Sequence, residues 1–565
     1  MLTPWADTLD RAQPLPEYPR PQMVRDSYLN LNGPWSYAIT TSANKPAQAD
    51  GTILVPFSPE SELSGVGHVL QPEEYLWYIR TVTLPDGFNV GRVLLHFGAI
   101  DQTATVWCNG VELATHTGGY LPFTVDITEV LAKENTILVC VRDATNKSQL
   151  PRGKQTLHPH GIWYTPQSGI WQTVWLESVP QNYIRSLHVT PLFDAHQVEI
   201  TVEGEGQCTI DLEGKRFTFP AGVPAHVPVQ SFRPWSPEHP TLYPFSVTLG
   251  DDTVYSYFAM RKCSVETDKD GVRRLFLNGK PYFHNGLLDQ GYWPDGLMTA
   301  PCDEAFLYDI QLAKKAGFNM LRKHIKMEPL LWYHYCDVQG ILVWQDMING
   351  GGRSIQTFLL YLPTVLPFVT TEFRDNCYPL FSRTSKTGRE WWKRECRETV
   401  HQLYNAPCVS LWVLFSEGWG QFDAREMTEM VRALDPTRQI DHASGWQDQG
   451  YEEMKSRHVY FRPVKLKNDG RALALTEYGG YILAVDGHRW TDKVFGYRIC
   501  RDSAALAHDY EKLMLGQVLP HIRKEGLTAA VYTQITDVEE ELNGLMTYDR
   551  EVLKKALTYF GVIGI

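Results

Sequence analysis

The stretch VSLWVLFSEGWGQFD, residues 409–423, places a short apolar run directly before a serine, a glutamate and a group of glycines and aromatic residues. Similar apolar runs alternate with helical stretches from about residue 263 onward. The runs include FNMLRKH, GILVWQD, QIDHASGW, RHVYF, LALTEYGG and AAVYTQITD, and the helical stretches include DEAFLYDIQLAKKAG and AREMTEMVRALD. This repeated β-α pattern predicts a (β/α)8 TIM barrel over residues 263–565.

The chain before residue 263 has a different sequence pattern. Short β-type runs alternate with turn residues, as in YLWYIRTVTLP, RVLLHFGAI and GIWQTVWLESV, which is typical of β-sandwiches. A break near LESVPQNYIRSLHVTP separates residues 1–180, an N-terminal β-sandwich, from residues 181–262, which have the scale of an immunoglobulin-like β-sandwich. The sequence therefore predicts three domains.

Composition and charge narrow the class of partner. Lys and Arg total 53 against 65 for Asp and Glu, a formal charge of -12, which opposes binding to nucleic acid or to anionic lipid. We find neither a signal-peptide pattern nor a long apolar span, and the ten cysteines form no CxxC pair, so we expect a cytoplasmic protein with reduced thiols. His158 and His160 lack a third ligand, and no glycine-rich phosphate loop follows a strand, so we expect no metal and no cofactor.

Two glutamates follow predicted barrel strands, at the positions where the active-site residues of a TIM barrel lie. Glu417 and Glu477 each follow an apolar run, and active sites of such barrels lie at the carboxyl ends of the strands. Paired carboxylates are what glycoside hydrolysis needs, one to donate a proton and one to attack the anomeric carbon. The alternative is that both cap helices or pair with Arg322 at the rim. Other strand-end residues suit the faces and hydroxyls of a sugar: Arg322, His324, Trp344, Asp346, Trp419, His442, Trp446, Tyr460 and Tyr532.

The chain resembles glycoside hydrolase family 2, the family of β-galactosidases, β-glucuronidases and β-mannosidases. The resemblance is carried by WYIRTVTLP (77–85), HFGAIDQTATVWCNGVELATHTGGYLPFTVDIT (96–128), GIWYTPQSGIWQTVWLE (161–177), LFLNGKPYFHNGLLDQGYWPDG (275–296), GFNMLRKHIKMEP (317–329), GILVWQDM (340–347), FSEGWGQFD (415–423) and LTEYGG (475–480). It implies a jelly-roll sandwich, an immunoglobulin-like sandwich and a catalytic barrel, in this order.

The resemblance also implies roles for individual residues. Glu417 would be the general acid/base and Glu477 the nucleophile of a retaining, exo-acting hydrolase. Arg322 would steady the nucleophile through charge-assisted hydrogen bonds. Tyr460 could hold the other oxygen of the nucleophile, or it could pack in the core. The candidates for sugar contact are Asp289, Trp293, Trp344, Asp346, His442 and Trp446.

Ser416 departs from the family pattern, in which asparagine ordinarily precedes the acid/base and donates to the sugar 2-hydroxyl. A serine hydroxyl can donate but reaches less far. Three interpretations follow: a substrate with altered geometry near C2, a slow enzyme, or a non-catalytic carbohydrate-binding protein on the same scaffold.

The substrate is predicted to be a small carbohydrate or glycoside. RKHIKMEP follows the second barrel strand in a register that differs from the family's usual one. The Asn-x-Lys signature by which glucuronidases bind the substrate carboxylate is not reproduced, which disfavours a uronide substrate. Lys326 or Arg353 could still bind such a carboxylate. A β-galactosidase-like activity ranks first, ahead of pentosidase, galactofuranosidase and β-hexuronidase activities. The insert at 350–388 would lie over the barrel mouth, where it could narrow the pocket or support a homo-oligomer, a dimer or tetramer.

Overall fold

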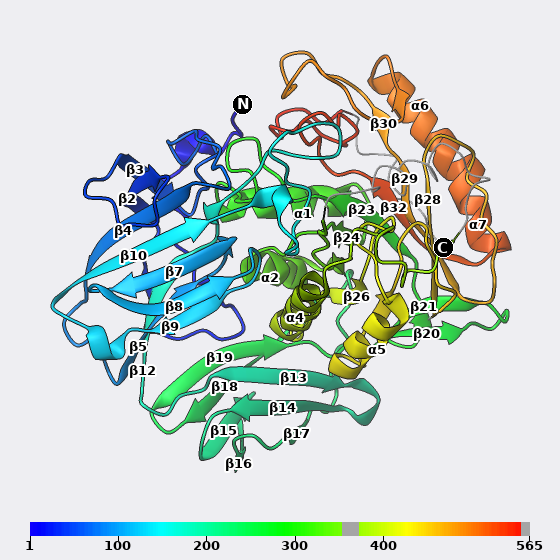
Figure 1. Ribbon diagram of the computed structural model, residues 1–565. Coiled ribbons are helices and arrows are strands. Elements are labelled where there is room, and N and C mark those ends of the chain that lie inside the picture. Colours follow the sequence, from blue (N-terminus) through cyan, green and yellow to red (C-terminus); the bar gives the residue numbers. More distant parts are fainter. Residues whose placement is uncertain (353–371, 452, 555–565) are drawn as a thin grey trace.

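The computed structural model describes residues 1–352, 372–451 and 453–554. Figure 1 shows two β-rich parts, one blue to cyan and one teal to green, beside a barrel that runs from green to red. The predicted fold class is confirmed, with a β-sandwich at the N-terminus, a second set of β-sheets and a C-terminal TIM barrel. The expected boundaries near residues 180 and 262 fall in the connections between these parts and remain our proposed domain limits.

The first part is a sandwich of antiparallel sheets. Inward-facing apolar residues from both main sheets form one core, which explains the alternation seen in the sequence. One sheet has the order β3-β2-β4-β10-β7-β8, another has the order β1-β12-β5-β9, and β11 pairs with β6. The strands are β1 (Leu29–Asn30), β2 (Gly33–Thr40), β3 (Gly51–Val55), β4 (Tyr75–Thr83), β5 (Arg92–Phe97), β6 (Ile100–Asp101), β7 (Thr103–Cys108), β8 (Val111–Thr117), β9 (Phe123–Asp126), β10 (Glu134–Arg142), β11 (Gly169–Ile170) and β12 (Val174–Val179).

The second part packs a three-stranded sheet, β13-β14-β17, with a four-stranded sheet, β16-β15-β18-β19. Its strands are β13 (Ser186–Leu192), β14 (Gln197–Glu203), β15 (Gln207–Leu212), β16 (Lys215–Pro220), β17 (Ala225–Pro228), β18 (Tyr243–Leu249) and β19 (Asp252–Phe258). A small antiparallel sheet of β20 (Cys263–Thr267), β21 (Arg273–Leu277) and β22 (Lys280–Pro281) precedes the first barrel strand.

The barrel is a parallel sheet of eight strands in the order β27-β26-β25-β24-β23-β32-β29-β28. The two edges, β27 and β28, contact each other and are linked by a hydrogen bond from Ser456 to Asp441, so the barrel is nearly closed. Most of its strands are buried along their whole length, as expected where helices cover the outside. The strands are β23 (His284–Asp289), β24 (Met320–Lys323), β25 (Leu342–Asp346), β26 (Val409–Val413), β27 (Gln439–Asp441), β28 (Met454–Val459), β29 (Ala472–Gly479) and β32 (Leu527–Thr533).

Helices surround the barrel (Figure 1). Their ends follow local chemistry: Ser385 caps α4 by accepting from the Gly388 amide, Asp502 caps α6 through Ala505, and Gly340 ends α2 in a left-handed conformation. The helices are α1 (Asp303–Lys315), α2 (Leu330–Gln339), α4 (Lys386–Leu403), α5 (Ala424–Leu434), α6 (Ser503–Leu513), the π-helical η6 (Met514–Val518) and α7 (Leu519–Lys524), and β30 (Tyr481–Ile482) pairs with β31 (Arg498–Ile499). Short 3-10 turns span Ala6–Thr8, Thr128–Val130, Thr145–Lys147 and Phe193–Ala195.

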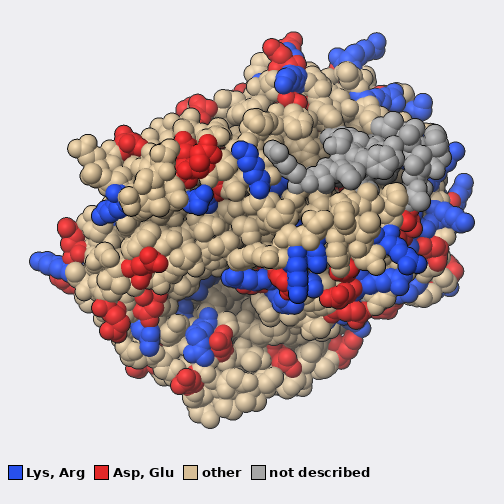
Figure 2. All heavy atoms as spheres, viewed as in Figure 1, with Lys and Arg blue, Asp and Glu red and all other residues tan. Residues whose placement is uncertain are grey.

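Surface and cysteine chemistry agree with the composition. Acidic and basic side chains are interspersed on the face in Figure 2. All ten cysteines are free thiols. Among the described residues, none of the helices is both long and apolar enough to cross a membrane.

Candidate active site

Glu417 and Glu477 lie at the carboxyl ends of barrel strands. Glu417 follows β26, and its amide donates to the Ser444 carbonyl at 2.8 Å, which ties the end of β26 to the segment after β27. Glu417 adopts a φ of 57°, a left-handed conformation that turns its backbone away from the strand direction. Glu477 lies within β29, next to an irregularity in its pairing with β32. The two segments place both side chains at the same end of the barrel.

The two carboxylates are close together. An oxygen of Glu417, a ring nitrogen of His458 and an oxygen of Glu477 all lie within 4.8 Å of one another. The Glu417 side chain is 20% exposed, whereas that of Glu477 is only 6% exposed. Glu417 therefore faces solvent more than its buried neighbour does.

Arg322 on β24 organises the buried side of the site. Its guanidinium is fully buried and donates to Glu477 Oε1 at 3.0 Å and to both oxygens of Asp346 at 3.0 Å. It also donates to the Ser416 hydroxyl at 3.1 Å. The bidentate bond to Asp346 at the end of β25 fixes the plane of the guanidinium, and this orientation aims the remaining donors at Glu477 and Ser416.

The surroundings of Glu477 favour its ionised form. Burial opposes ionisation, but the neighbouring imidazole of His458, the guanidinium of Arg322, the imidazole of His324 and a hydrogen bond from Tyr460 together lower the pKa of Glu477 to about 2. The Tyr460 ring is itself held by stacking on Tyr497, with the centroids 3.9 Å apart.

His458 on β28 is a site residue that the sequence analysis missed. Its Nδ1 lies 2.8 Å from Glu417 Oε1, and its Nε2 lies 3.6 Å from Glu477 Oε1 and 3.2 Å from the Ser444 hydroxyl. Its imidazole thus lies between the two carboxylates. One signal for it was present, because His458 stands two residues before Tyr460 in RHVYF and so shares its face of the strand.

Three further predicted residues lie at the barrel mouth. Burial, with the nearby charge of Lys154, lowers the pKa of His324, and its Nδ1 lies 2.7 Å from Asp346 Oδ2. The Trp446 indole donates to the Glu417 carbonyl at 2.9 Å. Trp419 makes an edge contact with Trp163 of the first sandwich at a centroid distance of 4.9 Å, so a loop of the N-terminal part reaches the barrel mouth.

Two family models match this architecture. The model described as "Glycosyl hydrolase 2 galactose-binding domain-like" matches residues 39–198, and "Glycosyl hydrolases family 2, TIM barrel domain" matches residues 273–465, together more than half of the chain. The chain belongs to glycoside hydrolase family 2. As a family 2 member it is a glycoside hydrolase.

The relatives of this family 2 hydrolase are named after different substrates. The chain is 25% identical over 455 residues to a β-galactosidase of Thermoanaerobacter pseudethanolicus, covering 74% of this chain and 55% of that protein, so the match spans about half of the relative's length. It is 25% identical over 468 residues to a β-glucuronidase of Paenibacillus borealis, covering 72% of this chain and 74% of that protein.

Solved structures share the whole fold. A β-glucuronidase from an uncultured Clostridium sp. superposes with a TM-score of 0.72 at 17% identity, over 94% of this chain and 96% of that one. A β-galacturonidase from Eisenbergiella tayi, bound to galacturonate, gives a TM-score of 0.69 at 18% identity, over 94% and 96% of the two chains. The TM-scores show that the folds are similar, and at identities this low the comparison shows the fold alone.

The structure of this family 2 hydrolase does not bring three of the predicted aromatic residues to the carboxylates. Trp344 is fully buried and donates to His284 at the start of β23, so its indole points toward the far end of the barrel. Trp293 packs beneath Arg550, whose guanidinium carbon lies 3.9 Å from its ring centroid. Tyr532 packs edge-on against Tyr478 and Tyr510. Buried strands turn alternate side chains inward and outward, and strand-end position alone does not distinguish these directions.

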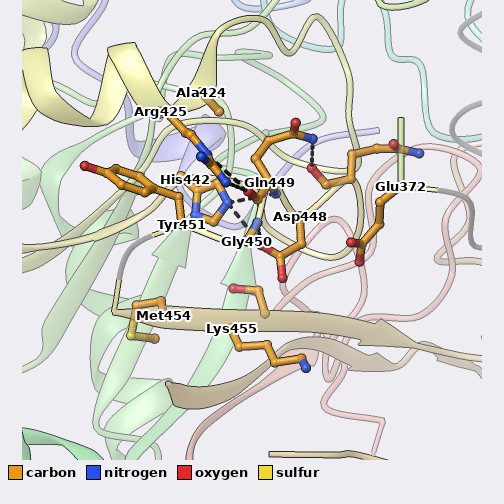
Figure 3. Close-up of polar contacts among 12 residues, drawn as sticks. Glu372, Ala424, Arg425, His442, Asp448, Gln449, Gly450, Tyr451, Met454 and Lys455 are labelled. Atoms are coloured by element: carbon orange, nitrogen blue, oxygen red, sulfur yellow. Dashed lines mark hydrogen bonds and ion pairs between the residues drawn. The ribbon is translucent and has the colours of Figure 1, made fainter. Parts of the chain in front are cut away.

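Two predicted polar residues are engaged elsewhere. Asp289 forms an ion pair with Lys323 at 2.7 Å, and Lys323 in turn pairs with Glu328. Figure 3 shows His442 turned toward Asp448 and Gln449, and its Nε2 accepts from the Gln449 amide at 3.2 Å. Among the described residues, neither forms a hydrogen bond or an ion pair with Glu417 or Glu477, so the geometry gives no support to their expected role in sugar binding.

Other cations named from the sequence are not at the site or are not described. Lys326 is fully buried, and its ammonium donates to Glu328 and to the Met298 carbonyl at 2.8 Å. Arg353 and most of the insert, residues 353–371, lie outside the described residues. The described end of the insert is anchored near the mouth, because Arg383 donates to the Gly420 carbonyl at 2.6 Å and to the Asn349 carbonyl at 2.7 Å.

The spacing of Glu417, His458 and Glu477 would also suit a metal ion. However, the Arg322 guanidinium lies 3.0 Å from Glu477, and its positive charge opposes a second cation at the same oxygen. The arrangement therefore suits acid-base and nucleophilic chemistry between two carboxylates better than metal binding.

Proposed function

We propose that this protein is a retaining, exo-acting β-glycosidase in which Glu477 is the nucleophile and Glu417 is the general acid/base. The observation that carries the proposal is the separation of the two side chains, with oxygens within 4.8 Å. Retaining enzymes place their carboxyl groups about 5–5.5 Å apart, whereas inverting enzymes leave roughly 6.5–9.5 Å for a water molecule.

The first half of the reaction forms a glycosyl ester. An oxygen of ionised Glu477 attacks the anomeric carbon while the protonated carboxyl of Glu417 gives its proton to the departing oxygen. The ion pair with Arg322 and the hydrogen bond from Tyr460 hold Glu477 in place and keep it ionised. In the second half, Glu417 takes a proton from water, which attacks the anomeric carbon and frees Glu477.

The terminal sugar belongs to one of two classes that the relatives' names suggest, a neutral galactoside or a hexuronide. The described part of the insert, which is anchored at Gly420, supports action on a chain end because it covers one side of the mouth. The free cysteines support the cytoplasm, a reducing compartment, as the location.

The test is nitrophenol release from a panel of aryl β-glycosides, which includes galactoside, glucoside, mannoside, glucuronide, galacturonide and galactofuranoside, and from α-L-arabinosides. The proposal expects wild type to cleave at least one of them and Glu477→Gln to lose roughly 10,000-fold or more in kcat/KM. Glu417→Ala should lose less with activated leaving groups and should regain turnover with azide, which needs no deprotonation. Binding of a sugar without turnover, by folded wild type, would instead support the non-catalytic carbohydrate-binding alternative.

A further inference from the structure

The tyrosine that donates to Glu477 is itself packed against another aromatic ring. Tyr460 lies one residue beyond the end of β28, and its hydroxyl donates to Glu477 Oε2 and lies 3.3 Å from the Thr533 hydroxyl. The Tyr460 ring stacks on the ring of Tyr497, with the centroids 3.9 Å apart and the planes 17° from parallel. The place of the Tyr460 hydroxyl therefore depends on Tyr497 as well as on its own strand.

The backbone at the end of β29 holds Tyr497 in this stack. Tyr497 directly precedes β31, in the orange part of the chain in Figure 1, and its amide donates to the Gly480 carbonyl at 3.4 Å. Gly480 follows Glu477 by three residues. A Cβ on Gly480 would lie 2.4 Å from Tyr497 Cδ2 and 3.4 Å from Tyr460 Cδ1, so the absence of a side chain lets both rings lie against the strand that carries Glu477.

Two phenylalanine rings support the outer side of Tyr497. The Phe461 ring meets the Tyr497 ring edge-on at a centroid distance of 4.8 Å, and the Phe495 ring does so at 6.1 Å. Phe495 also contacts the N-terminal sandwich, since a Cβ on Gly161 would lie 3.3 Å from Phe495 Cδ2. Glu540 ties these two segments together, because its carboxylate accepts from the Gly161 amide and its carbonyl accepts from the Phe495 amide, both at 2.7 Å. Barrel and sandwich thus both contribute to holding the stack.

We propose that Tyr497 is a positioning residue for the nucleophile: its ring holds Tyr460, and the Tyr460 hydroxyl then holds Glu477 in line with the anomeric carbon. This inference rests on the proposed glycosidase function, because it assigns a role in the reaction that Glu477 performs. Without the Tyr497 ring, the Tyr460 ring has space to turn, and its hydroxyl is no longer kept on a fixed line to the carboxylate. A displacement of about 1 Å in a reacting group is enough to cost roughly 100-fold in rate.

The experiment measures kcat and KM with the aryl glycoside that wild type cleaves best. The variants are Tyr497→Leu, which removes the ring, Tyr497→Phe, which keeps it, Tyr460→Phe, and the double variant Tyr460→Phe/Tyr497→Leu. Trp490→Leu is the matched control, because Trp490 lies in the same segment between β30 and β31 but packs on Tyr548, at a centroid distance of 5.7 Å. Thermal unfolding verifies that each variant is folded.

We expect Tyr497→Leu to lower kcat roughly 30-fold and to leave KM within about twofold, since it disturbs the geometry of attack and not the binding of the sugar. Tyr497→Phe and Trp490→Leu should each keep kcat within about twofold of wild type. Tyr460→Phe should lose at least as much as Tyr497→Leu. In the Tyr460→Phe background, Tyr497→Leu should cost no more than about twofold further, because no hydroxyl is left to be positioned.

A second variant tests the same point if Tyr497→Leu does not fold. Phe495→Leu leaves the Tyr497 ring in place and weakens only its outer support, so we expect a loss of about fivefold in kcat. This loss should also disappear in the Tyr460→Phe background, since both changes act through the same hydroxyl.

Three results would overturn the inference while turnover by wild type leaves the proposed function intact. In the first, Tyr497→Leu keeps kcat within about twofold of wild type. In the second, Tyr497→Leu loses as much in the Tyr460→Phe background as it does alone, which would mean that Tyr497 acts independently of Tyr460. In the third, Tyr497→Phe loses as much as Tyr497→Leu, so that the hydroxyl and not the ring is required. If folded wild type cleaves none of the glycosides in the panel, the proposed function itself fails, and this inference fails with it.

Discussion

The hydroxyl of Ser416 accepts a hydrogen bond of 3.1 Å from the guanidinium of Arg322. The residue before the expected acid/base is therefore attached to the arginine that binds Glu477. The family's asparagine at this position donates to the sugar, whereas this serine has its acceptor side occupied by Arg322. The serine thus helps to hold the arginine that supports Glu477, the proposed nucleophile.

Replacing this serine should have a modest effect. Ser416→Ala removes one of several acceptors of Arg322, so we expect a loss of about 1 kcal/mol in the free energy of unfolding and less than about tenfold in kcat/KM. Ser410→Ala is a matched control, since Ser410 is a buried serine of β26 that donates to the Val343 carbonyl. A loss of more than about 100-fold in kcat without a change in stability would mean that the Ser416 hydroxyl contacts the sugar.

Arg322 should set the acidic limit of activity. Its charge contributes to the lowered pKa of Glu477, and the proposed mechanism needs Glu477 ionised, so Arg322→Met should raise this pKa and move the acidic limb of kcat/KM to higher pH. It also leaves Asp346 and Glu477 without their buried partner, so we expect about 3–5 kcal/mol less stability and at least about 100-fold less activity at pH 7. Arg322→Lys keeps the charge and should shift the limb less. Unmoved limbs in both variants would contradict this role.

His458 should matter most when the leaving group needs a proton. Its Nδ1 lies 2.8 Å from Glu417 Oε1, so His458→Gln should disturb the carboxyl that we propose protonates the departing oxygen. We expect a loss of roughly 30-fold in kcat/KM with a methoxyphenyl leaving group and less than about threefold with a dinitrophenyl leaving group. Equal losses with both would assign His458 a purely structural role. His442→Gln serves as the control, since His442 is bound by Asp448 and Gln449.

The sequence predicted that Glu417 and Glu477 lie at strand ends, because each follows an apolar run, and these runs form β26 and β29 in the structure. The roles of the two glutamates came from the family resemblance. The sequence did not predict the direction of every side chain. Trp344 follows an irregularity in the pairing of β25 with β26, and its indole reaches His284 rather than the mouth. An irregularity in strand pairing depends on how two distant segments pair, so it cannot be predicted from a local sequence pattern.

The contacts between domains could not be predicted from the sequence either. Lys154 and Trp163 belong to the first sandwich, and their place at the barrel mouth follows from the packing of the loop on Ile325 and on residues 539–541. His458, by contrast, shares a strand face with Tyr460, and the period of two could have identified it.

Glu395 on α4 should make the protein less stable as pH rises. Burial raises the pKa of Glu395 to about 8, and both of its oxygens lack a hydrogen-bond partner among the described residues. The folded state therefore keeps a proton that the unfolded chain loses above about pH 4.5, so stability is full below that pH and declines up to about pH 8.

Glu395→Gln removes this group, so its free energy of unfolding should decline less between pH 5 and pH 8, by about 1.4 kcal/mol per pH unit. Denaturant unfolding at several pH values measures the slope. Glu390→Gln, at an exposed position of α4 that does not act on Glu395, should keep the wild-type slope. Part of the slope remains in both variants because burial also raises the pKa of Glu60 to about 8. Identical slopes for wild type and Glu395→Gln would refute the assignment.

The most direct measurement traps the glycosyl ester. A 2-deoxy-2-fluoro glycoside of the preferred sugar, with a dinitrophenyl leaving group, forms the ester quickly and releases it slowly. Digestion and mass spectrometry of the inactivated protein should then find the fluorosugar on Glu477, in the peptide that contains LTEYGG, and Glu477→Gln should remain unlabelled. A label on another residue, or steady hydrolysis to the inverted anomer without any label, would contradict the two-carboxylate retaining mechanism.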